Sequence, residues 1–567
     1  MYKILRLLEQ NDKKKLTFII ILIIFLGISE SLTFFFLQPI FHHFNDSKSS
    51  FQIINVENFF LNPNLYIYYL IGLFIIFFII RFILTILVHY KRADIVRNIN
   101  NNLSNKVFSY YLMKDYQFFI NSSDSKLVSN TIIEVEKFSY RVIDCFIGFV
   151  TEIFLVTGVL VFLFITYFYI SFILLSISFI FFLLAYNLYK NKFKSIGNVK
   201  VQNDASKIDV LTKSFYIIQN IKLDNLENYF INEFKKNTEN SSKSHFALSF
   251  FSELPKPIIE LFVLITVLIL VSFFYYNFDF KKKDILEILA IYGVAMFRIL
   301  PSLNRIFGYL NQLKFHYSTT EIISDIFKKK SLEDNEKTVQ EKYFGFKNII
   351  FDNVSFNYSQ NSNFILKNVN LSFNRGEIIG ISGKSGSGKS TLLNLLCYLL
   401  KPTSGKILVN NQDLENIYKS FQSKIGYVTQ KVFFTDGSII ENVVLGKNKN
   451  NYNYELFKEV INICGLENFI TNLKEKEESL IGERGTKLSG GQQQKLGIAR
   501  ALYKQPDILI LDEATNALDE DSEKEILKLI INLSKKITII LVSHKEAVLH
   551  ISEKIYEIKN NHLNQIK

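Results

Sequence analysis

Long apolar runs separated by polar stretches fill the chain up to about residue 320, whereas the remainder has shorter apolar runs broken by glycine. A helix needs about 20 apolar residues to cross a bilayer, and the first part contains several runs of that order. They lie at 16–41, 66–90, 146–166, 170–189, 255–276 and 285–310. Buried helices of a globular protein would not be so long and so numerous. We therefore expect six membrane spans followed by a separate α/β domain.

Lysine and arginine are concentrated before the first span, between spans two and three, and between spans four and five. The positive-inside rule predicts that such segments are cytoplasmic, so both ends of the chain are expected in the cytoplasm. Lys281, Lys282 and Lys283, between spans five and six, depart from this rule.

The formal net charge of +12 is spread over these basic segments and the second half. We interpret it as membrane topology and attraction to anionic lipids. No nucleic-acid partner is expected, because the sequence has no basic motif interleaved with aromatic residues. Cys145, Cys397 and Cys464 are scattered, so they predict neither a disulfide framework nor a metal site.

A charged segment at 328–343 is expected to link a membrane domain at 1–327 to a soluble domain at 344–567. Beyond it, an apolar strand leads into a glycine-rich loop and then into an apolar-periodic helix. The loop consists of Gly383, Lys384, Ser385, Gly386, Ser387, Gly388, Lys389, Ser390 and Thr391. Glycines let backbone N–H groups wrap phosphates at a helix N-terminus, as in the Walker A motif. We expect Lys389 to reach the β- and γ-phosphates of ATP and Ser390 to bind Mg²⁺.

A second apolar strand, at 508–511, ends in Asp512 and Glu513. Carboxylates at the end of a buried parallel strand lie at the mouth of a nucleotide site. Asp512 is expected to hold Mg²⁺ through water, and Glu513 to orient and polarise the attacking water. By itself this pair would be an ordinary exposed strand end, but the upstream loop favours the catalytic interpretation.

Between these two motifs stands the pentapeptide Leu488, Ser489, Gly490, Gly491 and Gln492. With it, the second half resembles the nucleotide-binding domain of ABC transporters. The resemblance implies a membrane α-helical domain of six transmembrane helices, of the ABC exporter type, followed by an α/β P-loop ABC ATPase domain. It also implies that the signature of one chain closes over the Walker A loop of another, most simply in a homodimer.

The resemblance implies further roles in the soluble half. Tyr358 would stack on adenine, Gln430 would lie near Mg²⁺ and the membrane domain, and His544 would contact the γ-phosphate. Asp519 falls in the D-loop, where Asn516 replaces the commoner serine. Each of these residues alone would be interpreted as packing or surface.

The sequence departs from the ABC transporter pattern at two positions, each of which follows a motif. Lys495 replaces the usual arginine after the signature, which keeps the charge but loses the planar fork, and Lys545 replaces arginine after His544. The segment 482–485 resembles the loop that precedes the signature in exporters. Because every catalytic group is retained, two competent ATP sites per dimer are expected.

The order of the two domains resembles the ABC exporter architecture. The resemblance implies that the segments 115–121 and 213–223 are coupling helices. It also implies a multi-pass protein of the bacterial cytoplasmic (inner) membrane, with its ATPase domain in the cytoplasm.

Arginines within the predicted spans are the best guide to the cargo. Insertion of an arginine such as Arg81 at the centre of a membrane helix costs about 2.5–3.5 kcal/mol. We therefore expect Arg81 to have a structural or functional role. Glu287, Arg298 and Arg305 in span six fall within about 20° of one another at 100° per residue, a polar stripe that would face a cavity. An anionic headgroup would suit the three arginines. Snorkelling remains open, as do ion pairs with three carboxylates, which are Glu30, Glu152 and Glu260.

The segments 297–306 and 316–318 are similar to the sixth-span region of bacterial lipid-linked oligosaccharide flippases of the PglK type. This resemblance implies an ATP-driven flippase that moves an amphipathic anionic substrate from the cytoplasmic to the outer leaflet. Export of a drug, peptide or other lipid is an alternative, and an ATP-gated channel or membrane regulator is another.

Overall fold

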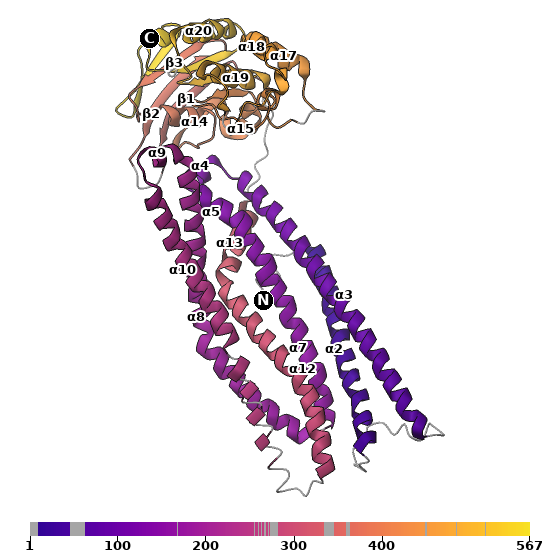
Figure 1. Cartoon of the computed structure of the whole chain (residues 1–567). Helices are drawn as coiled ribbons and strands as arrows, with labels where there is room; N and C mark the ends of the chain where they lie inside the picture. The colour runs from indigo at the N-terminus through magenta and orange to yellow at the C-terminus, as the bar shows by residue number, and fades with distance from the viewer. Residues whose placement is uncertain are drawn as a thin grey trace. The chain divides into compact units, whose positions relative to one another are not determined.

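The computed structural model describes residues 9–45, 63–166, 168–254, parts of 256–272, 282–333, 345–358, 363–447, 451–482, 485–515 and 518–567. The chain divides into two compact units (Figure 1). Unit 1 comprises Met1–Lys114 and Asn121–Asn335, and unit 2 comprises Asp115–Ile120 and Glu336–Lys567.

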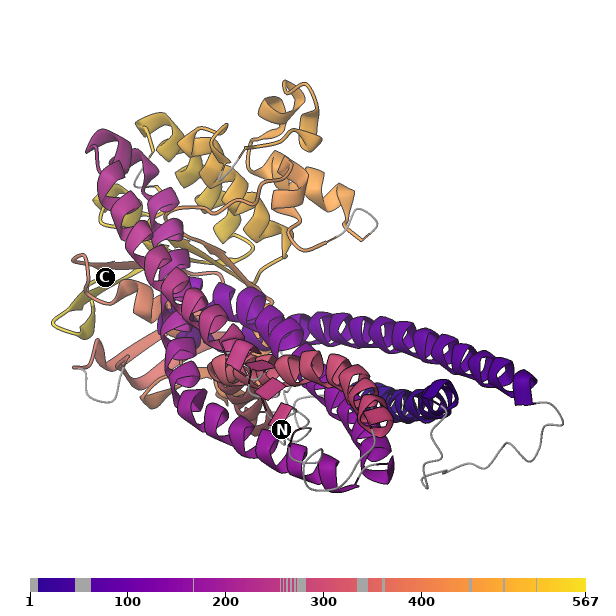
Figure 2. The same ribbon diagram turned by 60° about the horizontal axis from the view of Figure 1, so that its bottom comes forward.

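Unit 1 is built of helices that run alongside one another (Figures 1 and 2). Its described helices are α2 (Gln10–Asn45), α3 (Pro63–Leu112), α5 (Asp124–Ser129), η2 (Asn130–Glu134), α6 (Val135–Lys137), η3 (Phe138–Ile143), α7 (Asp144–Thr166), α8 (Phe168–Tyr216), α9 (Ile218–Leu223), α10 (Glu227–Glu253), α12 (Lys282–Phe315) and α13 (Tyr317–Glu333). Helix α2 packs against α3 and α7, α12 packs against α7 and α8, and α10 packs against α8.

Three helical stretches of the described residues are long and apolar enough to cross a membrane: Gln10–Leu37, Tyr68–Leu112 and Asp124–Thr166. They overlap the first three predicted spans. The predicted spans at 170–189 and 285–310 fall on α8 and α12, whereas the span at 255–276 lies largely outside the described residues. Six spans therefore stay a prediction.

Small residues let α2 and α7 approach closely. A Cβ atom added to Gly158 would collide with the carbonyl oxygen of Gly27, and one added to Gly27 would lie 2.7 Å from the carbonyl oxygen of Phe154. Membrane helices use such residues because van der Waals contact, rather than the hydrophobic effect, drives their association. The crossing brings buried Glu30 of α2 next to α7.

Two short helices coincide with the segments expected to be coupling helices. They are α4 (Tyr116–Ile120), which belongs to unit 2, and α9 (Ile218–Leu223) in unit 1. Helix α13 continues to Glu333, inside the range expected to be a linker.

Unit 2 contains two sheets. The first has the order β2-β1-β4-β5 and is antiparallel; its strands are β1 (Asn348–Phe356), β2 (Leu366–Asn374), β4 (Ser404–Val409) and β5 (Gln412–Asp413). The second has the order β10-β9-β3-β8-β7-β6; its strands are β3 (Ile378–Gly383), β6 (Ile425–Val428), β7 (Ile508–Asp512), β8 (Thr538–Val542), β9 (Lys554–Lys559) and β10 (His562–Gln565). All strands of this second sheet except β10 run parallel.

The helices of unit 2 besides α4 are α14 (Lys389–Leu396), α15 (Leu414–Gln422), α16 (Ile439–Val443), α17 (Tyr454–Ile463), α18 (Glu467–Thr471), η4 (Lys476–Glu478), α19 (Gly490–Tyr503), α20 (Glu520–Ser534) and α21 (Glu546–His550). Two apolar clusters fill the core. The parallel strands are apolar along almost their whole length because both faces are covered. Since their carboxyl ends share one sheet edge, the residues after β3, β6, β7 and β8 gather there.

Candidate functional site

The glycine loop after β3 turns into α14 at Gly388, which has a φ angle of +106°. Gly383 has a φ angle of +144°, and a Cβ atom there would lie 2.8 Å from the carbonyl oxygen of Ile558. Glycine is therefore required at both positions. The turn leaves backbone N–H groups at the N-terminus of α14, which is the arrangement that binds phosphate.

Lys389 is buried and donates to the loop's own backbone. Its Nζ lies 2.9 Å from the carbonyl oxygen of Gly383 and 3.2 Å from that of Lys384. It also lies 3.0 Å from Nε2 of His544 and 3.8 Å from Oε1 of Glu513. The residues after β3, β7 and β8 therefore converge, as the sequence predicts for Lys389, Glu513 and His544.

Glu513 has an unusual backbone for a residue with a side chain. Its φ angle is +52°, and its N–H donates to the carbonyl oxygen of Val542 over 3.0 Å. Left-handed conformations at such residues cost about 1–3 kcal/mol and cluster at functional sites. The Oε1 atom of Glu513 lies 3.2 Å from Nε2 of His544, so the strained turn aims the carboxylate at the predicted phosphate contact.

The predicted metal ligands offer oxygen atoms suited to Mg²⁺. Ser390 and Gln430 are exposed, and Asp512 is partly buried at the end of β7. Burial raises the pKa of Asp512, and a hydrogen bond donated by the Tyr427 hydroxyl, 3.0 Å from Oδ2, opposes this rise. Among the described residues no group of three acidic, histidine or cysteine side chains could hold an ion alone.

Tyr358, the predicted adenine contact, lies beside the start of α14. Its hydroxyl is 3.1 Å from Oγ1 of Thr391, and its ring packs edge-on against Phe356, with 5.0 Å between the ring centroids. The stacking role stays a prediction.

The signature forms the start of α19. Ser489 and Gln492 cap the helix reciprocally: the Ser489 N–H donates to Oε1 of Gln492 over 2.9 Å, and the Gln492 N–H donates to Oγ of Ser489 over 3.3 Å. Gly490 is exposed, and a Cβ atom on Gly491 would lie 2.9 Å from Oγ of Ser522. The helix N-terminus is thus formed and accessible, with glycine where α19 approaches α20.

Asp519, the predicted D-loop residue, caps α20 by accepting from the Ser522 N–H over 3.1 Å. Asn516 and residues 483 and 484, for which the sequence predicts roles, lie outside the described residues. The two lysines that replace arginine are both paired: Lys495 with Glu525, and Lys545 with Glu523.

Two contacts at this site were missed by the sequence analysis. Tyr427 binds Asp512, as described above, and Nε2 of Gln494 in α19 donates to the backbone carbonyl of Gln430 over 2.8 Å. The position of Tyr427 three residues before Gln430 is a signal that could have pointed to the first contact. The second joins segments far apart in sequence.

Two predicted substrate residues share one carboxylate in unit 1. Nε of Arg81 on α3 lies 2.6 Å from Oε2 of Glu30, and Nε of Arg298 on α12 donates to Oε1 of Glu30 over 2.7 Å. The side chain of Glu30 on α2 is 0% exposed. We call Glu30, Arg81 and Arg298 the charge trio. Of the alternatives that the sequence left open, the structure shows an ion pair with Glu30 for both Arg81 and Arg298.

The third predicted substrate residue is paired elsewhere. Nε of Arg305 lies 2.6 Å from Oε1 of Glu152 on α7, and the side chain of Arg305 remains 44% exposed. Although Arg298 and Arg305 share α12, their carboxylate partners thus lie on different helices, α2 and α7, and the common cavity stays a prediction. Glu260 is exposed, and the side chain of Glu287 lies outside the described residues.

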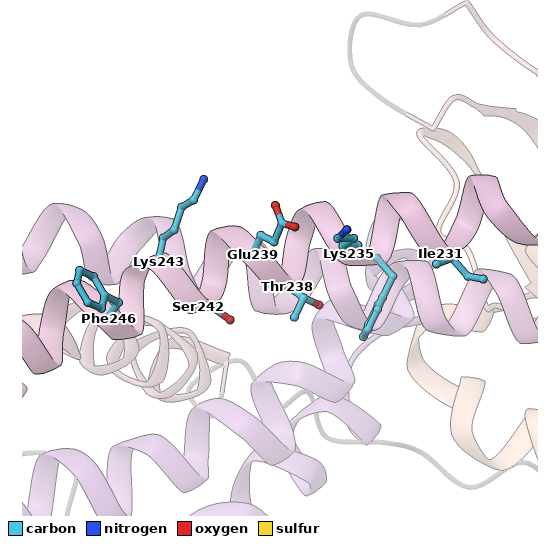
Figure 3. A pocket seen from close by; sticks show the side chains of 8 residues that line it. Ile231, Lys235, Thr238, Glu239, Ser242, Lys243 and Phe246 are labelled. Atoms are coloured by element: carbon cyan, nitrogen blue, oxygen red, sulfur yellow. The ribbon is translucent and has the colours of Figure 1, made fainter.

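A groove runs along α10 in unit 1, and all the residues that line it come from this helix (Figure 3). Ile231, Phe234 and Phe246 supply apolar surface, and Thr238 and Ser242 supply hydroxyls. None of the residues predicted to bind nucleotide or cargo lines this groove.

Both parts of the chain match family models. The ABC transporter transmembrane region matches residues 16–283, and the ABC transporter model matches residues 366–516. A solved bacterial Atm1-family ABC exporter with ATP bound superposes with a TM-score of 0.76 at 18% identity, covering 98% of this chain and 95% of that one. This likeness confirms the expected fold class.

Curated relatives are similar over part of the chain. The alpha-hemolysin translocation ATP-binding protein HlyB of Escherichia coli O157:H7 is 39% identical over 38% of this chain and 31% of its own length. A putative multidrug export ATP-binding/permease protein of Staphylococcus aureus is 40% identical over 38% of this chain and 37% of its own length. The chain thus spans less than half the length of these relatives. The chain therefore joins a region that matches the ABC transporter membrane family to a region that matches the ABC transporter ATP-binding family, in the fold of that exporter structure.

Proposed function

We propose that this chain is one half of an ATP-driven exporter that works by alternating access. The observation that carries the proposal is the convergence of Lys389, Glu513 and His544 at one sheet edge, with 3.0 Å between Lys389 and His544 and 3.2 Å between His544 and Glu513. A phosphate that enters the loop would replace the backbone carbonyls as the partner of Lys389.

The proposed chemistry is hydrolysis of the γ-phosphate. Lys389 and His544 hold the phosphate oxygens while Glu513 orients and polarises a water molecule. The water oxygen attacks the γ-phosphorus, the bond from that phosphorus to the β–γ bridging oxygen breaks, and ADP leaves. A bound Mg²⁺, held by Ser390, Asp512 and Gln430, would neutralise phosphate charge.

A second copy completes the site in this proposal. The accessible N-terminus at Ser489 and Gly490 would bind the γ-phosphate held by the partner's Walker A loop. Mixing two inactive variants tests this step. A Lys389→Ala chain keeps its signature and a Gly490→Asp chain keeps its Walker A loop, so a mixed dimer has one complete site. We expect ATPase activity to return in the mixture, and its absence would contradict the shared site.

We further infer an amphipathic, anionic cargo, with a lipid-linked oligosaccharide as the first candidate. In the charge trio two guanidinium groups share one carboxylate, which leaves one positive charge unbalanced, and ionisable residues at membrane depth are functional candidates. The side chains of Arg81 and Arg298 keep 18% and 29% exposure. The similarity of 297–306 to flippases of the PglK type supports the same cargo, since pyrophosphate pairs well with guanidinium.

The cargo test uses the purified protein in liposomes. A polyprenyl-pyrophosphate-linked glycan is expected to stimulate ATPase activity more than an uncharged lipid with the same chain. Arg81→Ala combined with Arg298→Ala is expected to abolish this stimulation and flipping, while the control Arg97→Ala, an exposed residue paired with Asp94, keeps both. Undiminished flipping by the double variant would exclude this cargo site.

Drug export is the second candidate, and the similarity to a Staphylococcus aureus protein named as a putative multidrug exporter favours it. Stimulation of ATPase activity by apolar cationic drugs, together with indifference to pyrophosphate lipids, would support this candidate over the first. Ion currents that require ATP binding but not hydrolysis would instead support a channel.

A further inference from the structure

Tyr427 on β6 lies against the predicted metal ligand on the neighbouring strand. Strands β6 and β7 are parallel, with Tyr427 opposite Ile510. Residues two apart on a strand face the same side, so the tyrosine hydroxyl reaches along β7 to Asp512. Its oxygen lies 3.0 Å from Oδ2 of Asp512, to which it donates.

This hydrogen bond meets a specific need of Asp512. Its carboxylate is partly buried, and a partly buried carboxylate requires hydrogen-bond donors to stay charged and fixed in one rotamer. Among the described residues, no lysine, arginine or histidine forms an ion pair with Asp512, although the charge of the more distant Lys389 opposes the rise that burial causes in the pKa of this carboxylate. The neutral hydroxyl supplies a donor and adds no positive charge that would repel a cation.

We propose that Tyr427 is a positioning residue for metal binding, acting through Asp512 rather than touching the ion. The proposal rests on the ATP site proposed above. In this proposal the segment 427–430 has two functions. Tyr427 positions Asp512, and Gln430, three residues later, is itself a predicted metal ligand. Groups that hold a metal ligand by hydrogen bonding commonly change metal affinity about 10–100-fold when removed.

A packing role for Tyr427 predicts something different. Its ring packs against the first core cluster of unit 2, and Tyr427→Phe keeps that ring while removing only the hydroxyl. A role in packing alone would therefore leave metal affinity unchanged in this variant.

The experiment measures Mn²⁺ binding to the purified full chain by electron paramagnetic resonance, with ADP present. Tyr427→Phe is expected to weaken nucleotide-dependent Mn²⁺ binding about tenfold, while the affinity for ADP in EDTA stays within about twofold of the unchanged protein. Tyr556→Phe is the matched control, because this buried tyrosine on β9 donates to the backbone carbonyl of Ser372 over 3.0 Å, away from Asp512.

A second comparison separates Tyr427 from a general loss of fold. In an Asp512→Ala background, Tyr427→Phe is expected to cause no further loss of Mn²⁺ affinity, because alanine has no oxygen that the hydroxyl could position. Equal Mn²⁺ affinity in Tyr427→Phe and the unchanged protein would overturn the proposal, as would an equal loss in Tyr556→Phe. If the unchanged protein showed no nucleotide-dependent Mn²⁺ binding, the proposed ATP site itself would fail.

Discussion

The nucleotide site and the charge trio both place a cation near a buried or half-buried carboxylate, yet they are built differently. Nζ of Lys389 lies 3.8 Å from Glu513 and donates to neutral carbonyls. Both arginines of the trio lie within 2.7 Å of Glu30. The lysine can exchange its neutral partners for phosphate at little cost. The arginines would have to give up a charged partner that has no access to water.

This difference follows from the surroundings of each group. The glycine loop holds its shape by backbone conformation, so Lys389 needs only the neutral carbonyls of the loop as its partners. In an apolar membrane domain an unpaired charge is far more costly, so ionic groups find partners within the protein. Predictions for the two regions therefore differ in kind: loss of chemistry in the nucleotide site and loss of stability in the charge trio.

The largest expected effect is on the charge trio. Glu30→Gln leaves two arginines facing one another without a carboxylate, and breaking a buried ion pair costs about 3–5 kcal/mol. A marked fall in melting temperature in detergent is expected. Glu152→Gln is the matched control and should cost less, because its partner Arg305 is 44% exposed. Equal losses would show that the trio is not specially buried.

The next effect is catalytic. Glu513→Gln removes the group proposed to polarise water, and loss of one positioned charge at a reaction centre lowers turnover about 10²–10³-fold. ATP affinity and melting temperature should change little, unlike in Glu30→Gln. Exposed Glu459→Gln on α17 is the control. Turnover retained in Glu513→Gln would remove Glu513 from the catalytic assignment.

His316 provides an intermediate case, because it is a buried base for which the described residues supply no ion pair. Burial, and then the neighbouring cations Lys200, Lys137, Arg141 and His245, lower the pKa of His316 from 6.5 to about 3. On acidification His316 takes up a proton in the unfolded chain at a higher pH than in the folded chain. The free energy of unfolding that neutral His316 contributes is therefore fully present above pH 6.5 and is lost as pH falls towards 3. The loss at pH 5 should be about 2 kcal/mol.

Melting temperatures between pH 5 and pH 7.5 check this prediction, with His316→Gln as the comparison. The substituted protein should lose less stability on acidification than the unchanged one. If both curves fall in parallel, His316 is not the responsible group.

The smallest effect is expected at Tyr358. Tyr358→Ala should weaken ATP binding by about 1–3 kcal/mol, the usual contribution of base stacking. Tyr358→Phe, which loses only the hydroxyl contact with Thr391, should stay within about threefold of the unchanged protein. Fluorescent nucleotide titration measures both, and equal losses would show that the hydroxyl rather than the ring face matters.

Some features could be predicted because they are local in sequence. The loop from Gly383 to Thr391, the strand ending at Asp512 and Glu513, and the signature start at Ser489 are each encoded within a few residues. The positions where helices and strands begin and end depend on backbone conformation and capping, which residues nearby in the sequence determine. The convergence at one sheet edge followed because parallel strands share that edge.

Other contacts depended on elements far apart in the chain. Tyr427 meets Asp512, and Gln494 meets the backbone of Gln430, only because the sheet order and the docking of α19 bring them together. No local pattern sets such pairings. For the charge trio, the sequence left the carboxylate partner open among Glu30, Glu152 and Glu260.

The sequence by itself therefore determined the two-part character of the chain and the identity of the phosphate-binding, acidic and signature motifs. These features could be predicted because the length of an apolar run and the backbone conformation of a motif are properties of short segments. Only the tertiary structure decided that Arg81 and Arg298 share Glu30 while Arg305 turns to Glu152. The close approach of α2 and α7 at Gly27 and Gly158 buries Glu30 between helices, and an ion pair forms where that packing removes water.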